Sequence, residues 1–434
     1  MALTRSATPA SDPVPTAARG LGRGANSAQT RAYNERVILQ RLRRFGEASK
    51  ADLARDIGLT QTAVGSIIQS LEEGGLVHAA GRRESGERGQ PAGLYRLNPK
   101  GAFGIGVRLD RSRMETVIAD LAGNILASRS HDRRLPDPER ALEIVHTDVR
   151  GVLRMLEPAE SGRLAGIGLG RPYNLGHWLH ELDLRAGFRK WDEVDFAAML
   201  RQATQMPVFE ENDGTAAAIA ELLFGVGHSE SDYLYLFVGP AVGGGAVLDG
   251  ESLRGRTGNA VDVGMLPVPH SRLASAPKAE GPATILLSRA SLNVLARHLR
   301  HRGVRIADRA DLQKAFDAAH PAFLEWFDDC IDALVYAVRA AVSVLDVPVC
   351  VIDTDIEGDF IAALIERLER ALGAIAPEWR VAPRVVRGSF GADASALGAA
   401  SLPMFFNFAP RAELLRRGPM AATLRSAPMA MDRP

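Results

Sequence analysis

Hydrophobic residues between positions 33 and 75 recur at helical spacing in three short segments. The apolar positions are Ile38, Leu42, Phe45, Leu53, Ala54, Ile57, Val64, Ile67, Ile68 and Leu71. Ser49 and Asp52 form the pattern of a capping box before the second segment. Gly58 predicts a tight turn after that segment, and Thr60 is placed to cap the third. Two short helices about a turn, preceded by a longer helix, are the arrangement of a helix-turn-helix.

A hairpin is predicted directly after these helices. Its strands, near residues 76–78 and 94–97, are joined by a segment rich in Gly and Arg, which is typical of a wing. Residues 31–98 hold 11 Lys and Arg against 8 Asp and Glu, an excess of +3 that suits a nucleic-acid partner. We therefore predict an α-rich winged helix-turn-helix domain over residues 31–98, with a protein-interaction module as the alternative.

The residues expected to touch DNA fall into two groups. Short polar side chains off the apolar stripe of the third helix suit base edges in the major groove, and these are Gln61, Thr62 and Ser66. Cationic side chains on the wing suit phosphates or the minor groove, and these are Arg82, Arg83 and Arg88.

The two ends of the chain lack this patterning. Residues 1–30 contain almost no large apolar side chains, so we expect a disordered tail, and residues 409–434 are expected to form a C-terminal tail.

After position 99 the pattern becomes that of strands and helices in alternation. A hairpin over residues 103–120, a helix over about 138–156 and a buried strand over 164–170 are predicted first. A similar order begins again at residue 233. The repetition predicts a duplicated α/β domain over residues 99–408, with lobes of about 99–228 and 229–408 and a cleft between them.

Composition narrows the class of protein. Lys and Arg balance Asp and Glu at 52 each, so any surface for a polyanion must be local. Cys330 and Cys350 lie in apolar surroundings without metal-ligand spacing, so we expect two reduced core thiols. Neither a membrane-length apolar run nor an apolar signal segment is found, so a cytoplasmic location and no membrane partner are expected.

The most informative polar segment is Glu211-Asn212-Asp213. It stands between a short apolar strand and a helix-forming run of small residues, which places it at a cleft mouth near a helix N-terminus. Asp213 is a candidate for a general base or for a ligand-holding carboxylate. The alternative is that Asn212 and Asp213 only cap the following helix.

The chain resembles the ROK family of sugar kinases and transcriptional repressors. The resemblance rests on the helix-turn-helix and wing, on Glu211-Asn212-Asp213, and on three further motifs over residues 104–123, 239–250 and 394–400. The winged helix is similar to the repressor branch. The resemblance implies an actin-like, hexokinase-type fold behind a DNA-binding head, assembled as a dimer or tetramer, with Asn212 and Asp213 at the sugar hydroxyls.

The parts of a sugar kinase that hold ATP depart from the family pattern. The segment matching the first phosphate loop reads Arg108 to Arg113 and lacks glycine, and Pro240-Ala241 stands in the second loop, where proline has no amide donor. Thr354-Asp355 replaces the glycines expected near adenosine. The zinc knuckle of the family lacks its cysteines here, so neither cofactor nor metal is expected.

The sugar pocket is partly retained. The resemblance places Asp262 at the position of a family glutamate, Met265 at that of a histidine, and Leu287 at that of a second glutamate. We therefore expect a small polar ligand, a sugar or sugar derivative, at Asn212, Asp213 and Asp262. The predicted function is a repressor without enzyme activity, and the alternatives are an active sugar kinase with an added DNA-binding domain and a regulator that responds to a protein partner.

Overall fold

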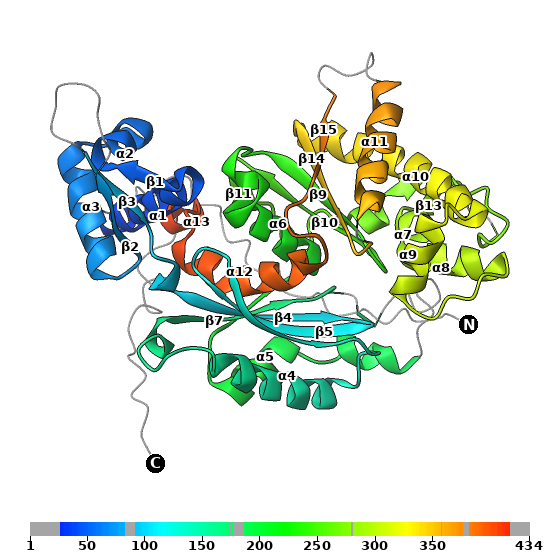
Figure 1. Cartoon of the computed structure of the whole chain (residues 1–434), viewed down its shortest axis with the longest axis horizontal. Helices are drawn as coiled ribbons and strands as arrows, with labels where there is room; N and C mark the ends of the chain where they lie inside the picture. The colour runs from blue at the N-terminus through cyan, green and yellow to red at the C-terminus, as the bar shows by residue number, and fades with distance from the viewer. Residues whose placement is uncertain are drawn as a thin grey trace, which may run out of the picture.

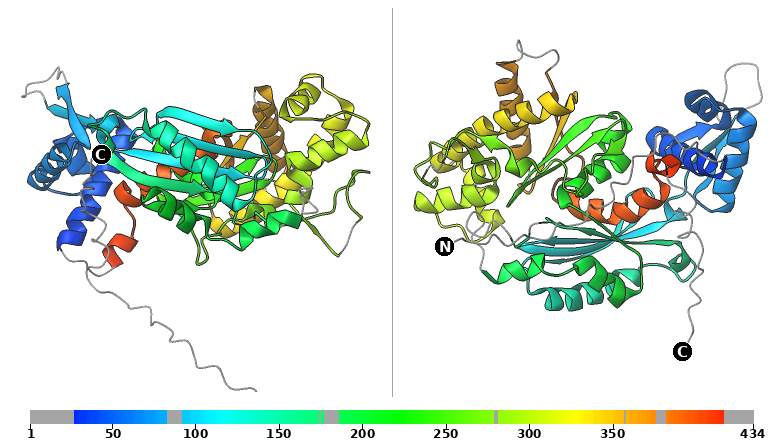
Figure 2. Two further views of the ribbon diagram at one scale, coloured as in Figure 1. Left: turned by 90° about the horizontal axis from the view of Figure 1, so that it is seen from below. Right: turned by 180° about the vertical axis from the view of Figure 1, so that it is seen from behind.

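The computed structural model of the chain describes residues 27–82, 92–173, 175–176, 186–278, 281–356, 358–375 and 382–416. It contains a small head, formed by the described residues up to Leu97, and a body with two β-sheets (Figure 1). Further views show the head at one end of the body, beside the end of helix α12 (Figure 2). No helix of the described segments is long and apolar enough to cross a membrane.

The head has the predicted winged-helix order. Its elements are α1 (Ser27–Phe45), β1 (Glu47–Ser49), α2 (Lys50–Ile57), α3 (Gln61–Glu73), β2 (Val77–Arg82) and β3 (Gly93–Leu97), with strand order β1-β3-β2. The two predicted caps are confirmed: Ser49 and Asp52 form a capping box on α2, and the Thr60 hydroxyl accepts from the backbone of Ala63 on α3. The apolar faces of the three helices form one buried core.

The predicted N-terminal disordered tail is wrong at its inner edge. Helix α1 begins at Ser27, so residues 27–30 are helical, while residues 1–26 lie outside the described segments. The early turns of α1 carry helix-forming Ala, Gln and Arg but no apolar stripe, so hydrophobic periodicity could not reveal them. At the other end, a short helix α13 (Glu413–Arg416) lies within the expected C-terminal tail.

The first lobe is a five-stranded sheet with helices on its outer face. Its order is β6-β5-β4-β7-β8, with β4 parallel to β7 and antiparallel to β5. Phe103, Ile105 and Val107 of β4 point to the core shared with α4 and α5. The elements are β4 (Phe103–Asp110), β5 (Arg113–Asp120), β6 (Ile125–His131), α4 (Pro138–Leu153), β7 (Leu164–Gly170), α5 (Phe196–Thr204) and β8 (Val208–Glu211).

The second lobe repeats this plan with order β11-β10-β9-β14-β15. Its outer face packs mainly on α10 and α11, and both cysteines are buried and unbonded there, as predicted. The elements are β9 (Tyr233–Val238), β10 (Val242–Leu248), β11 (Glu251–Ser252), β12 (Pro267–Val268), β13 (Thr284–Ile285), α7 (Leu287–Ala290), α8 (Leu292–His301), α9 (Arg309–Asp317), α10 (Pro321–Leu345), β14 (Val349–Thr354), α11 (Asp359–Gly373) and β15 (Arg384–Arg387).

Two helices, α6 (Asp213–Phe224) and α12 (Ala394–Phe408), lie between the two sheets (Figure 1). Their close packing depends on glycine: a Cβ on Gly398 of α12 would lie 2.4 Å from the backbone of Ala216 in α6. A Cβ on Gly168 of β7 would lie 1.8 Å from the carbonyl oxygen of Ala399. Although α12 lies within the predicted second lobe of residues 229–408, it packs directly on the first sheet. The two helices therefore form a central layer that touches both lobes.

Candidate functional site

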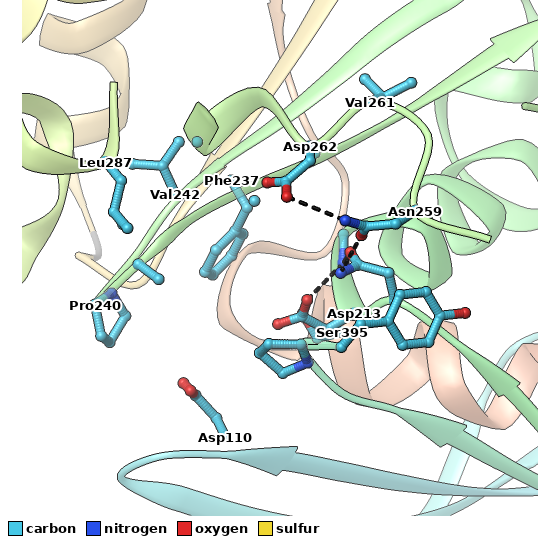
Figure 3. Close-up of a pocket in the computed structure, with 18 of the residues that line it drawn as sticks. Asp110, Asp213, Phe237, Pro240, Val242, Asn259, Val261, Asp262, Leu287 and Ser395 are labelled. Atoms are coloured by element: carbon cyan, nitrogen blue, oxygen red, sulfur yellow. Dashed lines mark hydrogen bonds between the residues drawn. The ribbon is translucent and has the colours of Figure 1, made fainter. Parts of the chain in front are cut away.

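A cleft opens between the lobes where α6 and α12 begin (Figure 3). It contains about 830 Å³ of empty space, part of it open to solvent. The three residues predicted to bind a ligand, Asn212, Asp213 and Asp262, all line it. Ser395, near the start of α12, lines it as well. The structure thus brings together residues that are up to 183 positions apart in the chain, counting from Asn212 to Ser395.

Asn212 both caps α6 and faces the cleft. Its side-chain oxygen accepts from the backbone of Gly214 at 2.9 Å, as the capping interpretation expects. Its amide nitrogen donates to the Asn259 side-chain oxygen at 3.5 Å, and the Asn259 amide donates to the Asp262 carboxylate at 3.1 Å. Dashed lines in Figure 3 mark these contacts. Asn259 therefore connects two predicted ligand residues from different lobes.

Asp213 lies in a cluster of charged groups on the floor of the cleft. Arg108, Asp110 and Arg111 from the end of β4 surround it, and Asp213 accepts from the backbone of Gly214 at 3.0 Å. Burial and the negative charge of Asp110 raise the pKa of the Asp213 carboxyl to about 6, although the two arginines oppose the shift. This carboxylate is ionised at neutral pH and can accept hydrogen bonds from hydroxyl groups.

Arg108 joins the cleft to a second acid. Its guanidinium is 3 % exposed, lies 3.9 Å from the Asp110 carboxylate and donates to the backbone of Ala392. Burial lowers the pKa of Arg108, whereas the negative charges of Asp355 and Asp110 raise it. The raising contributions are larger in sum, so the pKa of Arg108 is shifted upward. Asp355 also pairs with Arg309 at 2.8 Å. Asp355 is thus a buried acid whose charge acts on Arg108. Arg108 belongs to the segment predicted to have lost its phosphate-binding role.

The opposite side of the cleft is an apolar wall, formed by Phe237, Pro240, Val242, Met265 and Leu287. Figure 3 shows Leu287, Val242 and Pro240 grouped on the side away from Asn259. Leu287 and Val242 are each 5 % exposed, whereas Met265 is 43 % exposed at the mouth. The two sides of the cleft therefore differ in chemistry.

Four of the residues predicted to bind DNA lie within the described part of the head, and all four are exposed. Gln61, Thr62 and Ser66 are exposed on α3, off the buried stripe. Arg82 is exposed at the end of β2, where the wing begins. Arg83 and Arg88 lie outside the described residues.

Helix α1 attaches the head to the central layer through three arginines. Arg36 donates to the carbonyl oxygens at the end of α12, those of Phe406 at 3.2 Å and Ala409 at 3.3 Å. Arg44 donates to the carbonyl oxygen of His228 at 2.6 Å, just beyond α6 in the turn η4 (Val226–His228). Arg43 lies over the ring of Phe224, the last residue of α6, at 5.5 Å. The same two helices thus begin at the cleft and end at the head.

A second series of side-chain contacts leads from the cleft to α12. Glu211, adjacent to Asn212, is fully buried and forms an ion pair with Arg254 of the second lobe. Burial raises the pKa of the Glu211 carboxyl to about 7, against the opposing charge of Arg254. The Arg254 guanidinium stacks over the ring of Phe406 at 5.1 Å from its centroid. The carbonyl oxygen of this same Phe406 accepts the hydrogen bond from Arg36.

Sequence reasoning did not assign six further polar residues to the ligand site: Arg108, Asp110, Arg111, Tyr173, Asn259 and Ser395. Arg108 had a usable signal, because it is a charged residue inside the otherwise apolar stretch of β4. Asn259 gave none, since its role depends on a loop that folds over α6. Within the described parts of the chain, no group of three or more His, Cys, Asp or Glu side chains could hold a metal ion.

The ROK family model matches residues 104–404, which is more than half of the chain. The chain belongs to the ROK family. The uncharacterized protein y4fQ of Sinorhizobium fredii is 30% identical over 379 residues, covering 87% of this chain and 92% of that protein. The xylose repressor of Bacillus spizizenii is 23% identical over 247 residues, covering 56% of this chain and 62% of the repressor.

Solved ROK structures confirm the fold. A ROK family transcriptional regulator, a homolog of the Escherichia coli Mlc protein, aligns with a TM-score of 0.63 at 19% identity, covering 90% of this chain and 99% of that one. Sugar kinases match too, among them a glucokinase of Thermotoga maritima that is 26% identical over 265 residues, 57% of this chain and 82% of the kinase. The predicted hexokinase-type α/β fold is therefore confirmed for this chain, which has both repressors and kinases among its relatives.

Proposed function

We propose that the chain is a transcriptional regulator, a repressor, that binds operator DNA through its head and senses a small polar ligand in the cleft. One observation carries the proposal: α1 of the head contacts the ends of the two helices whose beginnings line the cleft. The named repressors among its relatives, and the alignment with a ROK regulator over 90% of the chain, support it.

In this proposal the head reads DNA as winged helices do. Gln61, Thr62 and Ser66 contact base edges, and Arg82, Arg83 and Arg88 contact phosphates or the minor groove. The exposure of the three α3 side chains on one helix supports this role. A homo-oligomer, a dimer or tetramer, would present two heads to a pseudo-palindromic operator.

The ligand is proposed to be a sugar or sugar derivative, held by Asn212, Asp213 and Asp262. Carboxylates suit such a ligand because each accepts several hydrogen bonds from hydroxyl groups. ATP phosphorylation is proposed to be lost, and no cofactor is needed. Pro240 offers no amide to a phosphate, and the acids Asp110 and Asp355 would repel one.

Regulation follows from the central layer in this proposal. A ligand that draws the lobes together changes the position of α6 and α12, and α1 follows because Arg36 and Arg44 are bonded to their ends. Such a ligand acts only through different affinities for the two arrangements.

The test begins with DNA selected from a random pool by the full chain. Thermal unfolding against a carbohydrate panel then identifies ligands, because a ligand at about 100 times its dissociation constant adds about 2.7 kcal/mol. A ligand that stabilises the chain should also change its affinity for the selected DNA. Stabilisation without such a change would exclude the proposed regulation, and a panel without any effect would favour a regulator that responds to a protein partner.

The second candidate is an active sugar kinase with an added head. Asn212, Asp213 and the retained Gly243-Gly244-Gly245 segment of β10 favour it, as do the kinase relatives. A coupled assay of ATP consumption with each sugar separates the two functions. Turnover that disappears in Asp213→Ala would replace the proposal with this one.

A further inference from the structure

The cleft has one polar and one apolar end. Asn259 and Asp262 stand with Asp213 at the polar end (Figure 3). The apolar wall, with Pro240, Val242 and Leu287, stands at the other. A ligand with hydroxyl groups over its whole surface would leave many of them without partners against this wall, which costs binding free energy.

The backbone of the apolar wall does not compensate for its side chains. Pro240 has no N–H group, and the N–H of Gly239 already donates to the carbonyl oxygen of Ala241 at 3.0 Å. The carbonyl of Gly239 in turn accepts from Leu292 at 2.8 Å. Both backbone groups of Gly239 are therefore occupied with internal hydrogen bonds, and Pro240 has no N–H group to offer to a ligand.

Charge at the polar end is nearly compensated. The cations Arg108 and Arg111 face the acids Asp110 and Asp213, and Asp262 adds one further negative charge at the mouth. An anionic ligand would meet these acids without a surplus of cations. The cleft therefore suits an uncharged ligand.

We propose that the ligand is an uncharged, polyhydroxylated ring that carries an apolar substituent, in the manner of an aryl or alkyl glycoside. The hydroxylated ring lies at Asp213, Asn259 and Asp262, and the substituent packs on the apolar wall. This inference rests on the proposed function and narrows its ligand class. The wall stabilises the bound substituent because burying apolar surface is favourable.

The experiment measures binding of free hexoses and pentoses to the full chain by calorimetry, each beside its own phenyl glycoside and its phenyl glycosiduronic acid. For at least one ring, the phenyl glycoside should bind about tenfold or more tightly than the free sugar, the gain expected for burial of one aromatic ring. The uronic acid should bind more weakly than the uncharged glycoside.

Two variants test whether the gain in affinity comes from contact with the apolar wall. Met265→Gln makes the exposed rim of the wall polar and should lower the ratio of phenyl-glycoside affinity to free-sugar affinity several-fold. Met155→Gln is the control, because Met155 is also exposed, at 58 %, but lies outside the cleft.

The outcomes distinguish an error in the inferred ligand class from an error in the proposed ligand sensing. Free sugars that bind as tightly as their phenyl glycosides would overturn the inference and leave ligand sensing intact. A preference that survives in Met265→Gln would also overturn it. Failure of every compound to bind would remove the proposed ligand sensing itself.

Discussion

Arg36 of the head donates a hydrogen bond of 3.2 Å to the carbonyl oxygen of Phe406, the third-last residue of α12. The ring of that same Phe406 lies under the guanidinium of Arg254 from the second lobe. One residue thus receives contacts from the head and from the cleft side of the body. The attachment of the head is therefore sensitive to small shifts of α12.

Removal of this contact should loosen the head without unfolding it. In Arg36→Ala, we expect the attachment to weaken by about 1.5 to 3 kcal/mol, the range for hydrogen bonds to a charged group. Faster hydrogen exchange in α1 and near residues 406–409 should report it. Arg41→Ala is the matched control, because Arg41 lies on the same helix but pairs with Asp56 inside the head. Equal exchange in the two variants would contradict the role of Arg36.

The charge of Asp213 should lower stability at neutral pH. Its pKa of about 6 in the folded chain exceeds the ordinary value of 3.8, so folding is favoured by protonation. The cost is absent below pH 4, grows as the pH rises to 6 and is then complete. Asp213→Asn should therefore be more stable than the parent chain by about 1 to 3 kcal/mol at pH 7, and equal to it near pH 4. Chemical denaturation at both pH values measures the difference, and a constant difference would refute the assigned titration.

The central layer should not tolerate added side chains on the first sheet. In Gly168→Ala, the new Cβ would lie 1.8 Å from the carbonyl oxygen of Ala399, and we expect a loss of about 3 kcal/mol or more. Gly162→Ala provides the control, because no atom lies within 4 Å of its added Cβ. Urea unfolding of both variants measures the effect. Equal stability would show that α12 does not pack as closely as described.

The wing should contribute to DNA affinity through charge. Arg82→Ala should weaken binding of the selected DNA about equally for all sequences and reduce the slope of log affinity against log salt by about 1. Arg129→Ala, which removes an arginine from β6 of the body, should leave both unchanged. An unaltered slope in Arg82→Ala would remove this residue from the interface.

Gln61→Ala should instead relax sequence preference at one base pair.

Local signals predicted the head well. The capping box at Ser49, the turn at Gly58 and the cap at Thr60 act within four residues of chain, so the sequence alone contains the information. The position of Asn212 and Asp213 was also predictable, because a strand followed at once by a helix places its connection at a sheet edge.

Non-local packing set the limit of prediction. The return of α12 to the first sheet depends on contacts of Gly104, Gly106 and Gly168 with Ala399 and Ala400, which lie far along the chain, so no local pattern indicates the pairing. Arg108 enters the cleft only because β4 alternates, with Phe103, Ile105 and Val107 on the other face. Asn259 reaches Asn212 through the fold of a loop, and no rule of spacing foretells that contact.

Two residues of the apolar wall, Met265 and Leu287, lie outside the contacts that hold the central layer on the first sheet. Met265 and Leu287 stand on the second-lobe side of the cleft, whereas the tight contacts between α12 and the first sheet involve Gly104, Gly106 and Gly168. If the proposed function is correct, substitutions at these two positions alter which molecule is recognised and leave the contacts between α12 and the first sheet intact. Evolution could then retune the ligand preference one residue at a time, without rebuilding the central layer.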